Sequence, residues 1–525
     1  MEAVGLVLAV PGVVDLCLKY GRELIILCSS FKNAQAEISE CLLRVGQSWV
    51  RLEEQLKNMT HIEPLMDERH RALYQRILST VQVKLEIAAS ALHQVIDVKG
   101  EDSQYELKVK RLKFAFKRDG LDRTLHDVET WMKNADLTWF LILRMSSPRI
   151  DSALTQAGSM LKATTPSILS IREGMHGGIP SNVPGTFGAT LSRTPHFLDQ
   201  MQVAEIPMCN ALFACTNTNS PVSTFILNKI YWPLLSGCND VKRVTRDLAR
   251  KLQHKDPDTF GLLSCEGFVT KSMEASSLEI LESTIIFGVP SGCSNPRSLR
   301  HCLINNPPPD TLTHRLLLAR DLAKSVGFVH TFGFVHKNVR PESILRFETS
   351  ATSPQPVFLV GFEHFRKEEG VTQRLGDQTF EGNLYLHPDR QGTSPQERYV
   401  MQHDIYSLGV VLLEVGMWKS FVEYIPEDGS IRPTLLLGAP PAAEGLQLLR
   451  YVLFSAQDRF LSLARLELPK IMGTEYARVV ETCLTCLDDN NNDFGDQSEF
   501  EDEDGIVVGA RYIEKVILRL SMINM

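Results

Sequence analysis

The stretch His336-Lys337-Asn338-Val339-Arg340-Pro341-Glu342-Ser343 decides how this chain is interpreted. It follows a helical pattern over 313–332 and precedes an apolar run over 358–360. Two of its polar positions hold a carboxamide, Asn338, and a hydroxyl, Ser343. A carboxamide cannot take a proton near neutral pH, and a hydroxyl is a weaker metal ligand than a carboxylate. The preceding helix has a predicted buried stripe that consists of Leu316, Leu317, Ala319, Leu322, Ala323 and Val326.

Three further segments follow this stretch in order. Phe358-Leu359-Val360-Gly361-Phe362-Glu363 has the pattern of a hydrophobic strand that ends at a glycine. His387-Pro388-Asp389 comes next, and the helical segment Asp404-Ile405-Tyr406-Ser407-Leu408-Gly409-Val410-Val411-Leu412-Leu413-Glu414 closes the series. The order and approximate spacing of the four segments resemble the C-lobe of a protein kinase. That family has H-R-D-L-x-x-x-N, then D-F-G and A-P-E, then a helix that anchors the catalytic loop.

The resemblance implies a kinase fold whose reacting positions are replaced. Asn338 stands where the family has the Asp that accepts the substrate proton, and Ser343 and Gly361 stand at its two magnesium-binding positions. His336 is expected to be structural, with no role in proton transfer. The same resemblance makes structural residues of Phe362, Pro388, Asp404 and Gly409. We therefore predict a pseudokinase that is not an enzyme, with no intact catalytic residue, metal site or cofactor.

The N-lobe resemblance is thinner. Strands are expected over 223–232, 261–269 and 283–290, and a helix over 241–252 that offers Asp247 but no Glu. Lys229 is the candidate nucleotide contact, although the register could equally place Asn228 at that position, and no G-x-G-x-x-G loop precedes it. Phosphoryl transfer depends on positioning and electrostatics, so we do not expect it to survive these changes. The rival interpretation is an atypical active or ATP-binding kinase that recruits Glu363.

Composition describes an ordinary globular protein. The 525 residues have room for two to four domains, and 43% are hydrophobic and 22% charged. The net charge of −8 gives no reason to expect nucleic-acid binding. Eleven scattered Cys residues favour a reduced, intracellular compartment, and the lone pair Cys483 and Cys486 does not predict a zinc site.

Residues 1 to about 150 have an all-helical pattern. Apolar residues recur every three or four positions on three segments, which predicts an antiparallel bundle with short connections. The first stripe is Ile38, Leu42, Val45, Trp49, Leu52 and Leu56; the second is Leu73, Ile77, Val81, Leu85, Ala88, Leu92 and Ile96; the third is Leu121, Leu125, Val128 and Met132.

This region resembles the fungal HeLo domain of HET-S-type cell-death proteins. The resemblance rests on the apolar start with Gly5, Gly12 and Asp15, the run 38–52, the basic-aromatic segment 111–118, and Trp131 with 139–142. It covers roughly the first 150 residues. It implies a bundle that damages membranes in fungal programmed cell death or heterokaryon incompatibility after its N-terminal helix is extruded.

The N-terminus and a basic cluster are the candidate membrane contacts. Ala3 to Val14 is uncharged, lacks the preceding basic residues of a secretory signal and is too short to span a bilayer. It is either a buried terminal helix or an insertable segment. Six cations within 108–118 form either a surface for anionic lipid or a solvated helix face. The candidate contacts are Val4, Leu6, Leu8, Lys110, Lys113 and Lys117.

The predicted domains are a HeLo-like bundle over 1–150, a partly flexible linker over 151–200 and a kinase-like domain over 201–525. Within the last, the N-lobe covers about 201–295, the C-lobe about 296–525, and an acidic disordered loop 488–504; a final amphipathic helix is expected over 509–523. The Gly-, Pro- and Ser-rich run 174–188 would not pack a core.

The resulting hypothesis is a non-catalytic signalling protein with a membrane-active bundle that a pseudokinase controls. The alternatives are an atypical kinase and an adaptor or scaffold without membrane activity. The expected partners are an upstream protein or ligand of unknown identity, anionic membrane lipid and further copies of the chain on activation, with no nucleic acid. The expected location is cytoplasmic, with recruitment to the plasma membrane on activation.

Overall fold

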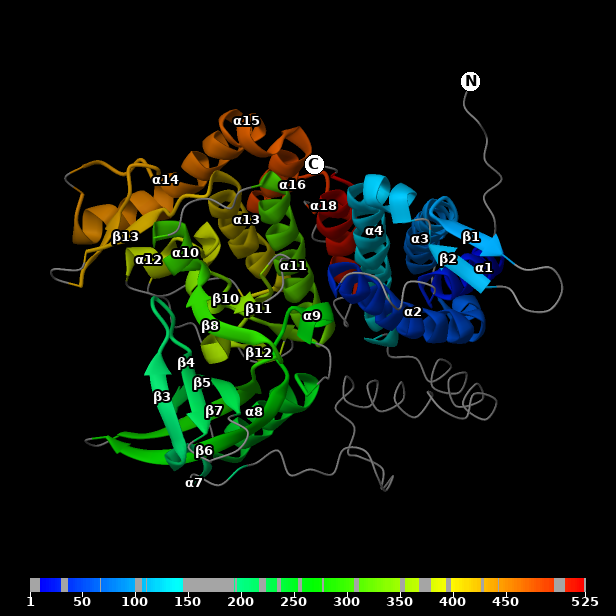
Figure 1. The fold of residues 1–525 in the computed structure, drawn as a ribbon. Helices are drawn as coiled ribbons and strands as arrows, with labels where there is room; N and C mark the ends of the chain where they lie inside the picture. The colour runs from blue at the N-terminus through cyan, green and yellow to red at the C-terminus, as the bar shows by residue number, and fades with distance from the viewer. Residues whose placement is uncertain are drawn as a thin grey trace. The chain divides into compact units, whose positions relative to one another are not determined.

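The computed structural model divides the chain into two compact units, Met1–Arg172 and Glu173–Met525, each of which is described by itself (Figure 1). The described residues are 10–29, 36–66, 68–99, 106–109, 111–144, 193, 196–216, 223–233, 238–253, 257–275, 278–305, 311–349, 355–367, 379–392, 398–425, 429–441, 443–494 and 506–523. The division between the units falls within the predicted linker 151–200, most of which lies outside these residues.

Four long helices build the first unit. They are α1 Val10–Ser29, α2 Ala36–Ile62, α3 Glu68–His93 and α4 Arg111–Arg144, with the short η1 Glu63–Leu65 after α2. The predicted apolar stripes of α2, α3 and α4 are buried wherever their side chains are described, which excludes Ile38. The expectation of a helical N-terminal region is therefore confirmed.

A two-stranded hairpin corrects the all-helical prediction for this region. β1 Ile96–Lys99 pairs antiparallel with β2 Glu106–Val109. Ile96, which the periodic pattern assigned to the helix, lies on β1 because α3 ends at His93 and a turn follows. The side chain of Ile96 is nevertheless buried. The apolar spacing therefore predicted its place in the core correctly and its secondary structure wrongly.

Ion pairs define how the helices run within the first unit. Arg44 on α2 lies 3.3 Å from Glu129 on α4, and Arg51 lies 3.4 Å from Asp136. From the first ion pair to the second, the residue number rises by seven on both helices, so α2 and α4 are parallel neighbours. Helices α3 and α4 run antiparallel, since Lys84 contacts Asp127 while Gln94, just after α3, contacts Lys117 near the start of α4.

The second unit begins with a five-stranded antiparallel sheet in the order β3-β4-β5-β7-β6. Its strands are β3 Met201–Glu205, β4 Leu212–Thr216, β5 Thr224–Pro233, β6 Cys265–Ala275 and β7 Leu278–Gly288. Helix α8, Cys238–Lys251, contacts β6. The short helix α7 His196–Asp199 precedes β3, and the short helix α9 Pro257–Phe260 lies between α8 and β6 in the chain. One side of the sheet packs a core of Met201, Ala214, Leu227, Val269 and Ile286.

Helices dominate the rest of the second unit (Figure 1). The longer ones are α10 Leu299–Asn305, α11 Leu312–Thr331, α13 Met401–Met417, α14 Gly445–Leu466, α15 Leu468–Met472, α16 Thr474–Leu484, α17 Ile506–Tyr512 and α18 Leu518–Met522, with the π turn Ile513–Ile517 between the last two. Short elements connect them: β8 Cys293–Ser298, β9 Phe334–Val335, η2 Pro341–Ser343, β10 Ile344–Thr349, β11 Val357–Leu359, η3 Phe362–His364, β12 Arg366–Lys367, α12 Phe380–Asn383, η4 Pro388–Arg390, β13 Val422–Tyr424 and β14 Ile431–Pro433. A helical region followed by an α+β region is therefore the observed fold class.

Two details of the second unit differ from the sequence-based expectation. On α11, Leu318 is buried and Leu317 is only half-buried, because this helix is covered on nearly all sides and its stripe is poorly defined. In the predicted acidic loop, the described part 488–494 is folded: Asp493 accepts from Arg519 at 2.8 Å, and Phe494 is buried. The stabilising guanidinium belongs to Arg519 on α18, which lies outside the acidic run, so the composition of that run alone could not indicate the contact.

Candidate functional site

The stretch 336–343 is held at the start of α13, where Asp404 bonds its backbone. One carboxylate oxygen of Asp404 accepts from the backbone N–H of His336 at 2.7 Å and contacts the His330 ring at 3.1 Å. The other accepts from the backbone N–H of Lys337 at 2.9 Å and the Tyr399 hydroxyl at 2.8 Å. Burial opposes ionisation, but these hydrogen bonds and the His330 ring outweigh it and lower the pKa of Asp404. Asp404 is therefore a fully partnered anchor for the loop.

The His336 ring packs against the first residue of η3. It is buried and packs against Phe362 with ring centroids 4.8 Å apart, and Phe362 in turn lies 6.1 Å from Phe287 of β7. Burial lowers the pKa of His336 to about 4, so the imidazole is neutral at neutral pH. The geometry gives His336 and Phe362 packing roles.

Asn338, Ser343 and Gly361 are brought together by the fold, as their sequence positions suggested. The Asn338 amide donates to the Gly361 carbonyl at 3.0 Å and to the Glu363 carboxylate at 2.8 Å. Gly361 has φ +85°, and a Cβ built on it would lie 2.6 Å from the Ser343 hydroxyl oxygen and 3.1 Å from the Asn338 amide nitrogen. Ser343 and Asn338 therefore occupy the space that a side chain at position 361 would need.

The structure distinguishes the two candidate residues on β5. Asn228 is fully buried, and its carbonyl oxygen accepts from the backbone N–H groups of Gly361 and Phe362, both at 2.8 Å. Lys229 points to the other face, as strand alternation requires, and lies 3.5 Å from Glu282 with 37% of its side chain exposed. Asn228 joins the cluster, and the candidate nucleotide contact Lys229 does not.

Glu363 is the one carboxylate bonded to this Asn338 cluster among the described residues. Burial raises the pKa of Glu363, and the charge of Arg340 and the Asn338 hydrogen bond offset this only in part. Protein kinases hold magnesium with an Asp carboxylate and an Asn carboxamide, and Glu363 alone does not supply that set of ligands. Within the described part of the chain, no group of three His, Cys, Asp or Glu side chains could hold a metal ion.

The remaining structural positions lie away from this cluster. Pro388 opens η4, and Asp389 is exposed and lies 3.2 Å from the His387 ring. Gly409 on α13 allows close packing on α16, because a Cβ there would lie 2.8 Å from the Cys483 Cβ. Pro388 therefore begins a short helix, and Gly409 permits a close helix contact.

A buried charge network that no sequence motif indicated joins the loop to α10 and α13. Arg300 on α10 is fully buried and donates to Glu342 at 3.0 Å and to Glu414 at 2.7 Å. It also bonds the Ser420 and Tyr385 hydroxyls. An Arg and a Glu inside two apolar segments were the available signals, but their partners lie more than forty positions away. The network ties α10 to the loop and to α13.

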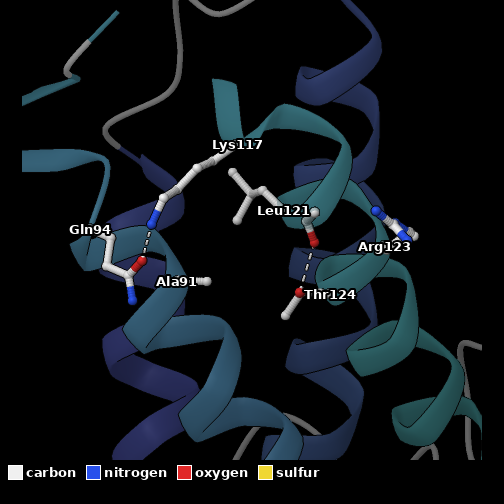
Figure 2. A pocket seen from close by; sticks show the side chains of 7 residues that line it. Ala91, Gln94, Lys117, Leu121, Arg123 and Thr124 are labelled. Carbon is white, nitrogen blue, oxygen red and sulfur yellow. Dashed lines mark hydrogen bonds between the residues drawn. The ribbon is translucent and has the colours of Figure 1, made fainter. Parts of the chain in front are cut away.

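In the first unit, Lys117 borders an open groove of about 540 Å³ between the end of α3 and the start of α4 (Figure 2). Ala91, Gln94, Gly120, Leu121, Arg123 and Thr124 line the rest, and the Lys117 ammonium donates to the Gln94 side chain. Lys117 is exposed, as a membrane contact would require. Val4, Leu6 and Leu8, and the side chains of Lys110 and Lys113, lie outside the described residues.

None of the described helices is both long and apolar enough to cross a membrane. A comparison with protein-family models finds no match for this chain, and a comparison with curated proteins finds none either.

Proposed function

We propose that this chain is a non-catalytic signalling protein in which a kinase-like second unit controls a HeLo-like first unit. The expected setting is fungal programmed cell death or incompatibility, with the helical unit acting on membranes. The observation that carries the proposal is the closed cluster of Asn228, Asn338, Ser343 and Gly361. By the resemblance, the amide Asn338 stands where phosphoryl transfer requires a proton acceptor, and Ser343 and Gly361 stand where it requires metal ligands.

The rival proposal, an atypical kinase, depends on Glu363. Its raised pKa would suit a proton acceptor, which is the specific observation in favour of this rival. One of its oxygens, however, already accepts from Asn338, and Gly361 beside it has no room for a metal-binding side chain. A single carboxylate cannot replace a base and two metal ligands, so the non-catalytic proposal is better supported.

The energetics of α1 limit how the first unit could act. Val10, Val13, Val14, Cys17, Leu24 and Leu27 of α1 are buried. At about 2 kcal/mol for each apolar side chain, releasing α1 would cost roughly 12 kcal/mol. Insertion into a bilayer would have to offset that cost. A trigger must also bind the released and packed states unequally, because equal binding shifts neither population.

The membrane part of the proposal is tested by dye release from anionic liposomes. We expect residues 1–172 to release dye and the full chain to release much less. A triple variant Val4→Asp, Leu6→Asp and Leu8→Asp should abolish release, whereas Val83→Asp, on an exposed position of α3, should not. These substitutions are sharper than deletion of residues 1–30, because deletion also removes the buried side of α1.

Absence of release by residues 1–172 at every lipid composition would favour the adaptor function. Equal release by residues 1–172 and by the full chain would contradict control by the second unit while leaving membrane activity in place. Release by the triple variant would exclude residues 4–8 as the inserting segment.

A further inference from the structure

The outer side of α14 in the second unit exposes large apolar side chains that nothing in the described structure covers. Leu446 is 76% exposed and Phe454 is 79% exposed. They lie on a 22-residue helix at the periphery of its unit (Figure 1), whose other side buries Leu448, Val452, Ala456, Phe460, Leu463 and Ala464. Two strongly exposed large apolar residues on one helix side are uncommon for a surface without a partner.

Charged residues flank Phe454 symmetrically on the same side. Arg450 precedes it by four positions and Asp458 follows it by four, and both are exposed. Residues at this spacing form one ridge along a helix surface. Neither residue has an ion-pair partner within the described part of the chain. Along the ridge the order is therefore a cation, an aromatic ring and an anion, each without a partner among the residues that the structure describes.

We propose that this ridge is a self-association surface on which α14 of a second copy packs antiparallel, about a twofold axis at Phe454. Reversal about that axis brings the Arg450 of each copy opposite the Asp458 of the other. Two equivalent ion pairs then flank a stack of the two Phe454 rings. A symmetric dimer requires such a self-complementary patch, because the same surface serves on both subunits.

The charge order also specifies the orientation. A parallel arrangement would place Arg450 against Arg450 and Asp458 against Asp458, which like-charge repulsion disfavours. One helix face is smaller than the standard interface of about 800 Å² per partner, so we expect a dissociation constant in the micromolar range. The surface belongs to the second unit alone and does not depend on the function proposed above.

The test is sedimentation velocity of the full chain from about 1 to 200 µM, a range that brackets micromolar dissociation constants. Wild type should shift from monomer to dimer across this range. Phe454→Asp should remain monomeric throughout. Arg450→Asp and Asp458→Arg should each raise the dissociation constant at least about tenfold, because each creates two like-charge contacts. The double variant Arg450→Asp with Asp458→Arg should restore the wild-type constant, since the pairs re-form with reversed sign.

Leu466→Asp is the matched control, because this residue is 62% exposed on the same helix but points to a different side. It should dimerise like wild type. A wild type that stays monomeric to the highest concentration overturns the proposal. Dimerisation that survives Phe454→Asp, or a double variant as weak as the single ones, overturns it as well, since the interface would then lie elsewhere or in another orientation.

Discussion

The stretch 336–343 contacts different kinds of polar group on its two sides, one facing α13 and the other facing Gly361. On its α13 side, Asp404 is ionised, buried and bonded to two backbone N–H groups, a hydroxyl and an imidazole. On its Gly361 side, Asn338, Asn228 and Ser343 surround a glycine, and the carboxylate that Asn338 contacts, Glu363, has a pKa raised by burial. The Asp404 side holds the backbone of the stretch through a carboxylate. On the Gly361 side, two Asn side chains bond the backbone of Gly361. The comparison teaches that the support of the loop and the chemistry of its Gly361 side depend on different residues, so that each can be changed separately.

The largest expected effect comes from removing the anchor. Asp404→Ala would leave two backbone N–H groups and the Tyr399 hydroxyl buried without an acceptor. We expect a loss of about 4 kcal/mol in the unfolding free energy of the second unit. Urea denaturation measures it, with Asp389→Ala as the control, because that carboxylate is 56% exposed and should cost less than about 0.5 kcal/mol. Equal losses for both variants would refute the anchoring role.

Glu129 extends the comparison to a buried, partnered carboxylate in the first unit. Burial would raise its pKa, but Lys133 and Arg44 lower it from 4.5 to about 2. Because the folded pKa is depressed, this stabilisation is present above about pH 4.5 and is lost as the pH falls toward 2. It amounts to about 3 kcal/mol at pH 7 and about 1 kcal/mol at pH 3.

The measurement compares urea unfolding of wild type and Glu129→Gln at both pH values. The stability difference between the two proteins should narrow by about 2 kcal/mol at the lower pH. A difference that does not change with pH would mean that the charge of Glu129 contributes nothing.

On the Gly361 side of the stretch, Gly361→Ala tests whether Ser343 and Asn338 leave no space for a side chain at position 361. The added Cβ would meet Ser343 at 2.6 Å in a backbone with φ +85°, so we expect destabilisation by about 3 kcal/mol. Gly292→Ala is the control, because its φ is +82° with nothing within 4 Å, and left-handed strain alone should cost about 1 kcal/mol. Thermal unfolding of both variants measures the difference, and similar costs would show that position 361 has free space.

The smallest expected effect concerns two helix glycines of the first unit, one crowded by a neighbouring side chain and one with free space. A Cβ on Gly21 of α1 would lie 1.9 Å from the Trp49 ring, so Gly21→Ala should destabilise this unit by about 2 kcal/mol. Gly46→Ala on α2 meets nothing within 4 Å and should stabilise it by about 0.7 kcal/mol, since alanine favours helix. Opposite signs in urea unfolding are expected, and equal signs would contradict the packing of α1 on α2.

Much of the helical framework was predictable, because stripes such as Leu73 to Leu92 carry their period in adjacent residues. The hairpin after α3 was not, since the apolar spacing continued to Ile96 and a single glycine, Gly100, is a weak turn signal in the sequence. Only the register of β5 shows that Asn228, and not Lys229, faces Gly361, because a shift of one residue moves each side chain to the opposite face of the sheet. The Arg300 network joins segments distant in sequence, and one sequence cannot pair them.

The most direct measurement of the central claim is phosphoryl transfer by the full chain with radiolabelled ATP and Mg²⁺ or Mn²⁺. We measure self-labelling and labelling of a generic protein substrate. The account predicts no labelling above a heat-denatured control, for wild type and for the double variant Asn338→Asp with Gly361→Asp. Labelling by wild type that Glu363→Gln abolishes, while Glu423→Gln at an exposed position of β13 leaves it intact, would contradict this expectation. Such a result would identify the chain as an atypical kinase that uses Glu363.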